Sequence, residues 1–294
     1  MRFGRWGLWA APVVLLAGCT AATGDAPSGE AGAPTATPVG RYVAMGDSYT
    51  SGLGVPPQSG VPAGCFRSGV NYPALVAKAL GAADFADVSC SAARTTHLTT
   101  AQQVSGGPNR PQFDALSPET RLVTLGIGAN DAGFMEVLTR CGLASLTGKG
   151  CPAEFTGPGG ADEVSGRIAA AGGNLGTALA ELKRRAPQAR VFVVGYPELF
   201  PPDPAGCAQT LSGVEPADVA YLTGKQHELE AELRRRTEAA GVRYVSTVAP
   251  GRDMCAGQDT RWVEPLSAAE GRSPLHPNAA GERGMADAVL AAVR

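Results

Sequence analysis

Short apolar runs alternate with longer amphipathic runs along most of this chain, and this alternation limits the folds that it can adopt. The apolar runs predict strands at 41–45, 85–89, 121–125, 190–194 and 242–248. The amphipathic runs predict helices at 71–80, 162–185, 216–240 and 277–293. Because helical runs separate the strands, we expect an α/β fold with a central five-stranded parallel sheet that helices cover on both faces.

The composition is typical of a globular protein and argues against other classes. Hydrophobic residues make up 44% of the chain and charged residues 18%, which supplies a core and excludes a disordered chain or a coiled coil. The 25 basic and 27 acidic residues give a net charge of −2, without a basic stripe interleaved with aromatic residues. We therefore expect no nucleic acid partner.

The N-terminal segment has the pattern of an export signal. Two arginines precede an apolar run at 6–16 that is too short to span a bilayer. The sequence LAGC at 16–19 resembles a bacterial lipobox, which predicts a lipoprotein signal peptide at 1–18 and acylation of Cys19. The alternative is an ordinary secretory signal that is cut near Ala22.

Residues 19–40 separate this signal from the folded part of the chain. They contain no aromatic residue and only one branched aliphatic residue, which predicts a flexible tether. The folded domain is then 41–294, attached through Cys19 to the outer face of the cytoplasmic membrane, or secreted. No later apolar run reaches the length of a membrane span, so we expect no transmembrane helix.

Six further cysteines, an even number in a chain with an export signal, indicate disulfide bonds. Six cysteines allow about fifteen pairings, and the sequence alone does not choose among them. We favour the sequential pairing, because each bridge would close a loop beside a candidate site segment. No CxxC pair or nearby histidine supports a metal site. The favoured pairs are Cys65–Cys90, Cys141–Cys151 and Cys207–Cys255.

A candidate nucleophile, Ser48, follows the first predicted strand in the sequence GDS. Ligands bind at the carboxyl ends of parallel strands, and a helix that begins there offers backbone N–H groups to an anion. The alternative is that Asp47 or Ser48 only caps a helix. The G-x-S-x-G elbow of α/β-hydrolases is absent, because Tyr49 and Thr50 follow the serine.

A second candidate, Asn130, lies in the sequence GAND after the strand at 121–125. An asparagine amide at a strand end can donate hydrogen bonds to the oxyanion of a tetrahedral intermediate. Because glycine and asparagine are also common turn residues, a simple turn is the alternative.

The third candidate is His276, which precedes a predicted helix start at Pro277. A histidine held at a defined point of a loop suits a general base that must reach a serine hydroxyl. Of the other two histidines, His227 lies on a polar helix, where we expect it to be solvated, and His97 lies in a threonine-rich loop without an evident partner.

Together these segments resemble the SGNH, or GDSL-type, hydrolase family. The four sequence blocks of that family correspond to GDSYTSG at 46–52, CSAA at 90–93, GAND at 128–131 and SPLHPN at 273–278. The resemblance covers 41–294 and implies a three-layer α/β/α, flavodoxin-like fold. With its predicted export and three sequential disulfides, the chain resembles the secreted actinobacterial (Streptomyces-type) lipase and esterase branch of this family.

Two positions depart from the family pattern. In the second block, Ala92 stands where the family has a glycine whose N–H belongs to the oxyanion hole. Alanine keeps that N–H group, provided that its φ and ψ suit a residue with a Cβ atom. The resemblance therefore implies an oxyanion hole of the Ser48 and Ala92 N–H groups and the Asn130 side chain.

In the last block, Ser273 replaces the aspartate that orients the histidine in most members of the family. Members of the secreted branch use a main-chain carbonyl instead, so we expect a Ser48–His276 dyad oriented by the backbone carbonyl of Ser273. A carbonyl fixes the tautomer but stabilises imidazolium less than a carboxylate does. The alternative is a carboxylate from the preceding loop, for which the candidates are Glu264, Asp259 and Glu270.

The resemblance implies a monomeric serine esterase or lipase that forms an acyl-enzyme and needs no cofactor. The expected substrates are carboxylic esters of short to long acyl chains, phospholipids included. Four apolar residues after Asn130 could hold an acyl chain or only bury a helix face; they are Phe134, Met135, Val137 and Leu138. The alternatives for the function are a carbohydrate O-acetyl esterase and a non-catalytic surface lipoprotein that binds lipid or glycan.

Overall fold

A computed structural model describes residues 39–207, 210–211 and 214–294 of the chain. Contacts group the chain from residue 37 onward into one compact unit. The predictions for the signal peptide at 1–18, acylation of Cys19 and most of the tether at 19–40 concern residues outside those that the structure describes.

The centre of the fold is one sheet of five parallel strands in the order β2-β1-β5-β6-β7. The register places Val43 beside Val123, and Val123 beside Val191. Buried parallel strands read as nearly continuous apolar runs, which is why the sequence pattern located them. The strands are β1 (Arg41–Gly46), β2 (Phe85–Asp87), β5 (Thr120–Gly126), β6 (Arg190–Val194) and β7 (Arg243–Val245).

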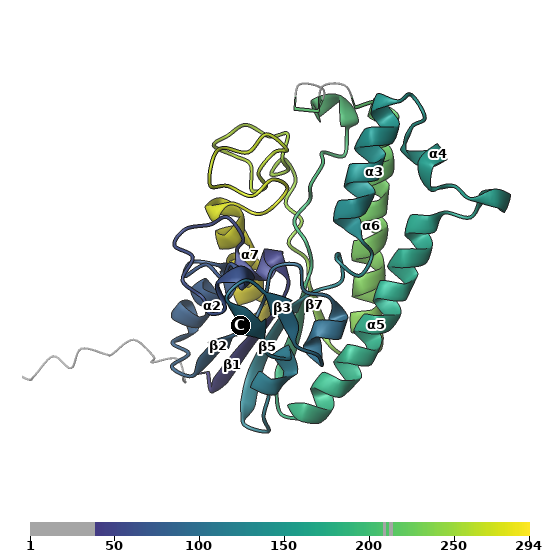
Figure 1. Cartoon of the computed structure of the whole chain (residues 1–294). Helices are drawn as coiled ribbons and strands as arrows, with labels where there is room; N and C mark the ends of the chain where they lie inside the picture. The colour runs from purple at the N-terminus through teal and green to yellow at the C-terminus, as the bar shows by residue number, and fades with distance from the viewer. Residues whose placement is uncertain (1–38, 208–209, 212–213) are drawn as a thin grey trace, which may run out of the picture. The chain divides into compact units, whose positions relative to one another are not determined.

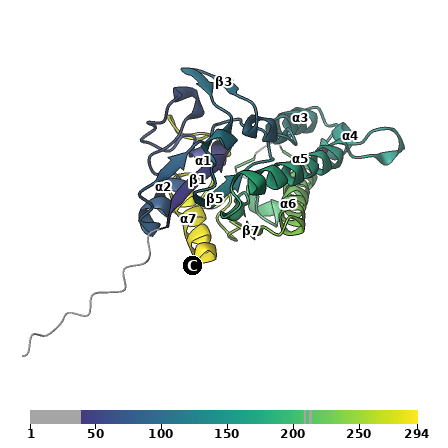
Figure 2. The same cartoon turned by 90° about the horizontal axis from the view of Figure 1, so that it is seen from below.

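Helices cover both faces of this sheet, which confirms the predicted three-layer α/β/α fold (Figures 1 and 2). Successive side chains of a strand point to opposite faces, so β1 contributes to two cores. Tyr42 and Ala44 pack in the core beneath α2 (Tyr72–Leu80) and α7 (Ala279–Val293). Val43 and Met45 face the other core, beneath α5 (Glu163–Arg185) and α6 (Pro216–Ala239).

Several shorter elements escaped the sequence pattern. A helix and a short second helix occupy the insertion after β5, and a two-stranded antiparallel hairpin follows β2. These elements are α3 (Phe134–Leu146), α4 (Cys151–Phe155), β3 (Gln102–Val104) and β4 (Gly107–Asn109). The remaining helical turns are α1 (Ser48–Ser51), η1 (Ala63–Cys65), η2 (Thr95–Leu98), η3 (Gln112–Ala115), η4 (Pro158–Gly160) and η5 (Pro204–Cys207).

Three disulfides connect loops at the carboxyl ends of the strands. The pairs are Cys65–Cys90, Cys141–Cys151 and Cys207–Cys255, which is the sequential pairing. The first bridge joins the segments that follow β1 and β2, and the second joins α3 to α4. Such cross-links restrict the unfolded chain and so stabilise the loops that surround this edge of the sheet. Over the described part of the chain, no helix has both the length and the apolarity of a membrane span.

Candidate active site

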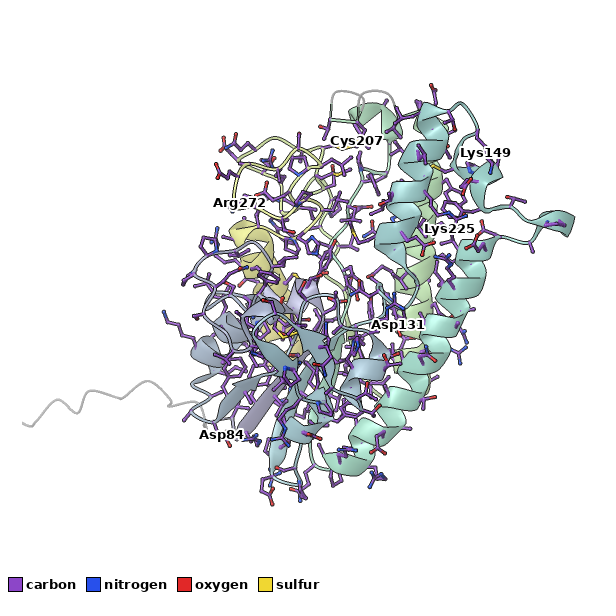
Figure 3. All side chains as sticks on the ribbon, in the orientation of Figure 1. Asp84, Asp131, Lys149, Cys207, Lys225 and Arg272 are labelled. Atoms are coloured by element: carbon purple, nitrogen blue, oxygen red, sulfur yellow. A yellow bond between two sulfur atoms is a disulfide. The ribbon has the colours of Figure 1, made fainter. Side chains whose placement is uncertain are left out.

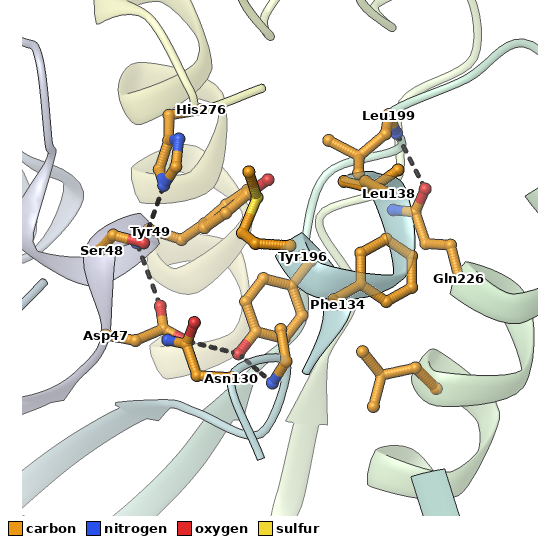
Figure 4. A pocket seen from close by; sticks show the side chains of 13 residues that line it. Asp47, Ser48, Tyr49, Asn130, Phe134, Leu138, Tyr196, Leu199, Gln226 and His276 are labelled. Atoms are coloured by element: carbon orange, nitrogen blue, oxygen red, sulfur yellow. Dashed lines mark hydrogen bonds between the residues drawn. The ribbon is translucent and has the colours of Figure 1, made fainter. Parts of the chain in front are cut away.

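The structure brings Ser48 and His276 into direct contact, although 228 positions separate them in the chain. Nε2 of His276 lies 2.8 Å from Oγ of Ser48, and both side chains are largely buried (Figure 4). Ser48 is the first residue of α1 at the end of β1, and His276 lies on the loop just before α7. The contact therefore forms at the carboxyl edge of the sheet, where parallel sheets bind ligands.

Local hydrogen bonds hold Ser48 at this point. The Asp47 carboxylate caps α1 by accepting a hydrogen bond from the Tyr49 N–H at 3.0 Å. Gly46 adopts a φ of 151°, and a Cβ atom there would collide with the carbonyl of Gly126 and the side chain of Thr50. Asp47 is thus the capping residue, and the Ser48 hydroxyl is left to face His276.

The imidazole of His276 is oriented by a backbone carbonyl, but by a different one from the one predicted. Nδ1 lies 2.8 Å from the carbonyl of Pro274 and 3.2 Å from the hydroxyl of Ser273. The carbonyl of Ser273 instead accepts the backbone N–H of His276 at 3.3 Å and closes a turn. Proline in the second position and a φ of 62° at Leu275 are features of a type II turn. The turn occupies the Ser273 carbonyl and leaves the Pro274 carbonyl to meet the ring.

None of the three alternative carboxylates replaces this carbonyl. Glu264 supports the loop through its backbone, which exchanges hydrogen bonds of 2.9 Å with Leu275 and His276. Its carboxylate pairs with Arg261 and Arg272. The other two candidates, Asp259 and Glu270, are exposed.

Burial controls the protonation of His276. Burial lowers the pKa of His276 below its usual value, and the hydrogen bond to the Pro274 carbonyl raises it by less. The imidazole is therefore neutral at pH 7, with Nδ1–H donating to the carbonyl and Nε2 free to accept the serine proton. Tyr49 supports this loop, because its hydroxyl donates to the carbonyl of Leu275 and its ring lies 5.0 Å from the His276 ring.

The candidate oxyanion donors lie on three segments, which follow β1, β2 and β5. Asn130 Nδ2 donates to the carbonyl of Ala93 at 3.0 Å, which fixes the amide at the end of β5. Ala92 has a φ of 61°, the left-handed conformation that favours glycine, so alanine keeps the backbone shape of the residue that it replaces. Ser48 and Asn130 line the pocket, whereas Ala92 does not. A role for Ala92 in the hole stays a prediction.

Tyr196, which follows β6, joins these loops and was not among the predicted site residues. Its hydroxyl donates to Asp47 at 2.6 Å and accepts the backbone N–H of Ala129 at 3.1 Å. Its own N–H donates to Glu230, which also accepts the hydroxyl of Tyr244. The only sequence signal was its position at a strand end, in the turn after Val194.

Two buried carboxylates lie in this network. Burial raises the pKa of Asp47 to about 7, although the hydrogen bonds from Tyr196 and Tyr49 lower it in part. Burial likewise raises the pKa of Glu230 to about 7, against the hydrogen bonds from Tyr244 and Tyr196. Both groups therefore change charge near neutral pH, behind the loop that carries Ser48.

The pocket beside Ser48 and His276 is lined mainly by apolar side chains. Val137 is fully buried in the core, whereas Met135 is 47% exposed. Of the four apolar residues after Asn130, Val137 therefore buries a helix face and the other three line the pocket. A role for them in holding an acyl chain stays a prediction. The large apolar lining residues are Phe134, Met135 and Leu138 of α3, together with Leu199 and Leu229.

The other candidates lie apart from this pocket. His227 is half-exposed and contacts Glu198 at 3.1 Å, and His97 accepts a hydrogen bond from the N–H of Arg94. Asp131 accepts hydrogen bonds from Thr95 and so supports the turn after β5. Within the residues that the structure describes, no group of three or more His, Cys, Asp or Glu side chains is arranged to hold a metal ion.

Comparison with known proteins places this geometry in a family. Residues 44–283 match the GDSL-like Lipase/Acylhydrolase family. Lipase 2 of Streptomyces coelicolor is 41% identical over 286 residues, which cover 95% of this chain and 92% of that protein.

Solved structures agree with the sequence match. The phospholipase A1 from Streptomyces albidoflavus NA297 is 28% identical with a TM-score of 0.72, covering 87% of this chain and 99% of that one. The extracellular lipase from Streptomyces rimosus is 25% identical with a TM-score of 0.70, covering 86% and 99%. These matches confirm the predicted family: the chain belongs to the GDSL-like lipase/acylhydrolase family and is a carboxylic ester hydrolase.

Proposed function

We propose that Ser48 is the nucleophile and His276 the general base with which this protein hydrolyses lipid esters. The observation that carries this proposal is the 2.8 Å contact between Nε2 of His276 and Oγ of Ser48 at the mouth of an apolar pocket. A nucleophile and a base within hydrogen-bonding distance, with the base oriented by a third group, form the arrangement that serine hydrolysis requires.

The reaction begins when His276 Nε2 takes the proton of Ser48 and Oγ attacks the ester carbonyl carbon. The resulting tetrahedral intermediate collapses, and His276 returns the proton to the leaving alcohol, which leaves an acyl-enzyme. Water, deprotonated by His276, then attacks the acyl carbon, releases the carboxylic acid and restores the serine. The Pro274 carbonyl keeps Nδ1 protonated and stabilises the transient imidazolium.

Three donors serve the oxyanion in this proposal: the N–H groups of Ser48 and Ala92 and the side chain of Asn130. The Ser48 N–H is at the first position of α1, where no helical acceptor exists for it. The Asn130 amide is held in place by Ala93. A hole built from fixed donors stabilises developing charge without rearrangement, which makes it the largest single contribution in many acyl-transfer enzymes.

The pocket favours an acyl chain over a sugar. Carbohydrate recognition needs several polar side chains, whereas Phe134, Leu138 and Leu229 present hydrocarbon in the pocket that Ser48 and His276 also line. The names of two relatives, a lipase and a phospholipase A1, agree with an acyl substrate. We therefore place the O-acetyl esterase and the non-catalytic binding protein behind a lipase or phospholipase.

The experiment that tests this function measures hydrolysis of p-nitrophenyl esters from acetate to palmitate by the wild type and by Ser48→Ala. The proposal expects activity that is lost in Ser48→Ala and that favours chains longer than acetate. Activity on acetate alone would favour the O-acetyl esterase. A folded wild type that hydrolyses none of the esters would favour the binding protein.

We further propose that the protein is exported and anchored by a lipid on Cys19. The arginines, the apolar run and the LAGC sequence support this location, and the extracellular lipase of Streptomyces rimosus agrees with export. Growth with a clickable palmitate analogue should label the wild type in the membrane fraction. Cys19→Ser should lose the label, and an unlabelled wild type in the medium would instead support an ordinary signal cleaved near Ala22.

A further inference from the structure

The exposed large hydrophobic side chains of the described residues all lie in stretches that follow the carboxyl ends of strands. They are Val61, Phe66, Val70, Met135, Leu143, Leu146, Val248 and Leu266. Each belongs to a segment that leads from the carboxyl end of a strand into the following helix: the first three follow β1, the next three follow β5 and the last two follow β7. This is the edge that carries Ser48 and His276.

The opposite edge of the sheet has a different surface. The connections that lead from helices back to strands, such as 81–84 and 186–189, carry no exposed large hydrophobic side chain in the described chain. Isolated exposed apolar residues are ordinary in soluble proteins, but they should then be scattered over the whole surface. Their restriction to the edge with the pocket points to a partner at that edge.

Helix α3 carries apolar side chains both at the pocket and at its exposed end. Met135, Leu138 and Leu146 are separated by three and eight residues, so they follow one side of the helix, and the first two line the pocket. Leu143 and Leu146, toward the far end of α3, are 64% and 76% exposed. Apolar side chains thus lie on one side of α3 both at the pocket and toward the solvent-exposed end of the helix, with Thr139 and Gly142 between them.

The charges beside α3 are already paired within the protein. Arg140 bonds to Glu136, Glu154 and Glu163, and Lys149 bonds to Glu154. Figure 3 shows Lys149 near the end of α3 and Arg272 on the far loop, where Arg272 lies 3.7 Å from Glu264. Paired cations contribute little attraction to an anionic membrane, so this surface fits a lipid without net charge.

From these observations we infer that the carboxyl edge of the sheet, with α3 at its centre, docks on the surface of a zwitterionic lipid aggregate. This inference rests on the proposed function and adds how the substrate is reached: an ester from the surface layer passes along α3 into the pocket. Binding of this kind depends on how much apolar area enters the interface.

The test measures partition of residues 37–294, which hold every described element and all three disulfides, onto phosphatidylcholine vesicles. All proteins carry Ser48→Ala, so that no lipid product accumulates. Leu143→Ser/Leu146→Ser should weaken partition about tenfold, and Leu266→Ser on the facing loop about threefold, because each loses hydrocarbon from the interface. Ala169→Ser/Ala170→Ser on the exposed side of α5 is the matched control and should leave partition unchanged.

The same variants with Ser48 intact separate this inference from the proposed function. Leu143 and Leu146 lie outside the pocket lining, so hydrolysis of monomeric p-nitrophenyl acetate should stay within about twofold of the wild type. A folded wild type that does not hydrolyse p-nitrophenyl acetate would overturn the proposed function. The docking inference would be overturned if Leu143→Ser/Leu146→Ser hydrolysed the ester normally and bound the vesicles as well as the wild type. It would also be overturned if the wild type did not bind the vesicles. A dimer lost in Leu143→Ser/Leu146→Ser, without vesicle binding, would assign the face to a second copy.

Discussion

The pocket has two walls that are held in different ways. The catalytic wall, formed by 46–49 and 273–276, is fixed by hydrogen bonds that reach from Tyr196 through Asp47 and Tyr49 to the turn around His276. The α3 wall presents apolar side chains, one of them half-exposed, to the same cavity. A reaction that moves one proton needs fixed atoms, whereas an acyl chain needs only hydrocarbon of the right length. We therefore expect the catalytic wall to control rate and the α3 wall to control substrate choice.

The largest effect should come from breaking the catalytic wall itself. Ser48→Ala and His276→Ala should each reduce kcat about 10⁴-fold to 10⁶-fold, because nucleophile and base act as one unit. For the same reason the double variant should be no slower than either single variant. Single-turnover hydrolysis of p-nitrophenyl butyrate measures this, and multiplying losses in the double variant would contradict a dyad.

The second largest effect should come from Asn130, the side-chain oxyanion donor that follows β5. Asn130→Ala removes an amide that Ala93 holds in place, and kcat should fall about 10²-fold to 10³-fold. The KM should change little, since the donor acts on charge that develops only in the transition state. Asn130→Asp should be at least as slow, because its carboxylate would repel the oxyanion. A kcat near the wild-type value in either variant would show that Asn130 is not an oxyanion donor.

A change on the α3 wall should sharpen the contrast by altering selectivity alone. Leu138→Ala shortens a pocket side chain, so kcat/KM for p-nitrophenyl palmitate should fall about tenfold. Hydrolysis of the acetate should stay within about twofold, because that acyl group ends before the wall. Equal losses on both esters would show that α3 supports the catalytic residues rather than the acyl chain.

The positions of the strands could be predicted from the sequence, whereas the helices inside the long insertions could not. Strands such as β1 and β5 are buried on both faces and therefore read as nearly continuous apolar runs. In contrast, α3 begins after Gly133 and includes Gly142, and this insertion reads as a loop rich in glycine, proline and cysteine.

The candidate site shows the same limit at atomic scale. The residues Ser48, Asn130 and His276 were predicted, because each lies within a recognisable block. The orienting carbonyl was assigned to Ser273 rather than Pro274, since that choice depends on the peptide orientation within one turn. Tyr196 was missed because its partner Asp47 is 149 positions away and no local pattern marks the pair.

Tyr196 offers a milder way to loosen the catalytic wall. Tyr196→Phe removes the hydroxyl that bonds to Asp47 and accepts the Ala129 N–H, so kcat should fall about tenfold. The hydrogen bond from Tyr196 lowers the pKa of Asp47, which is about 7 in the wild type. Its loss should therefore raise the pKa of Asp47. The acidic limb of the kcat profile should then move to higher pH. A lower kcat with an unmoved limb would make Tyr196 a packing residue only.

The smallest effect on catalysis should come from Glu230, which acts on the wall only through Tyr196. Because the pKa of Glu230 is raised to about 7 in the folded protein, the fold favours the protonated carboxylic acid. The stability that this group contributes is fully present below the pKa of an unfolded glutamate, and it is lost as the pH rises through 7. Relative to the wild type, Glu230→Gln should therefore gain about 2–3 kcal/mol in free energy of unfolding between pH 5 and pH 8. Urea denaturation measures this, with the exposed Glu238→Gln on the same helix as control; a difference that does not vary with pH would contradict burial of a titrating carboxyl.

The most direct test of the account is to trap the acyl-enzyme. Wild type and Ser48→Ala should be mixed with p-nitrophenyl butyrate, quenched in acid within the first turnover, digested and examined by mass spectrometry. We expect a butyryl group on the peptide that contains Ser48, and no such group on any peptide of Ser48→Ala. An acyl group on another residue, or hydrolysis by Ser48→Ala at the wild-type rate, would contradict the central claim that Ser48 carries the acyl group.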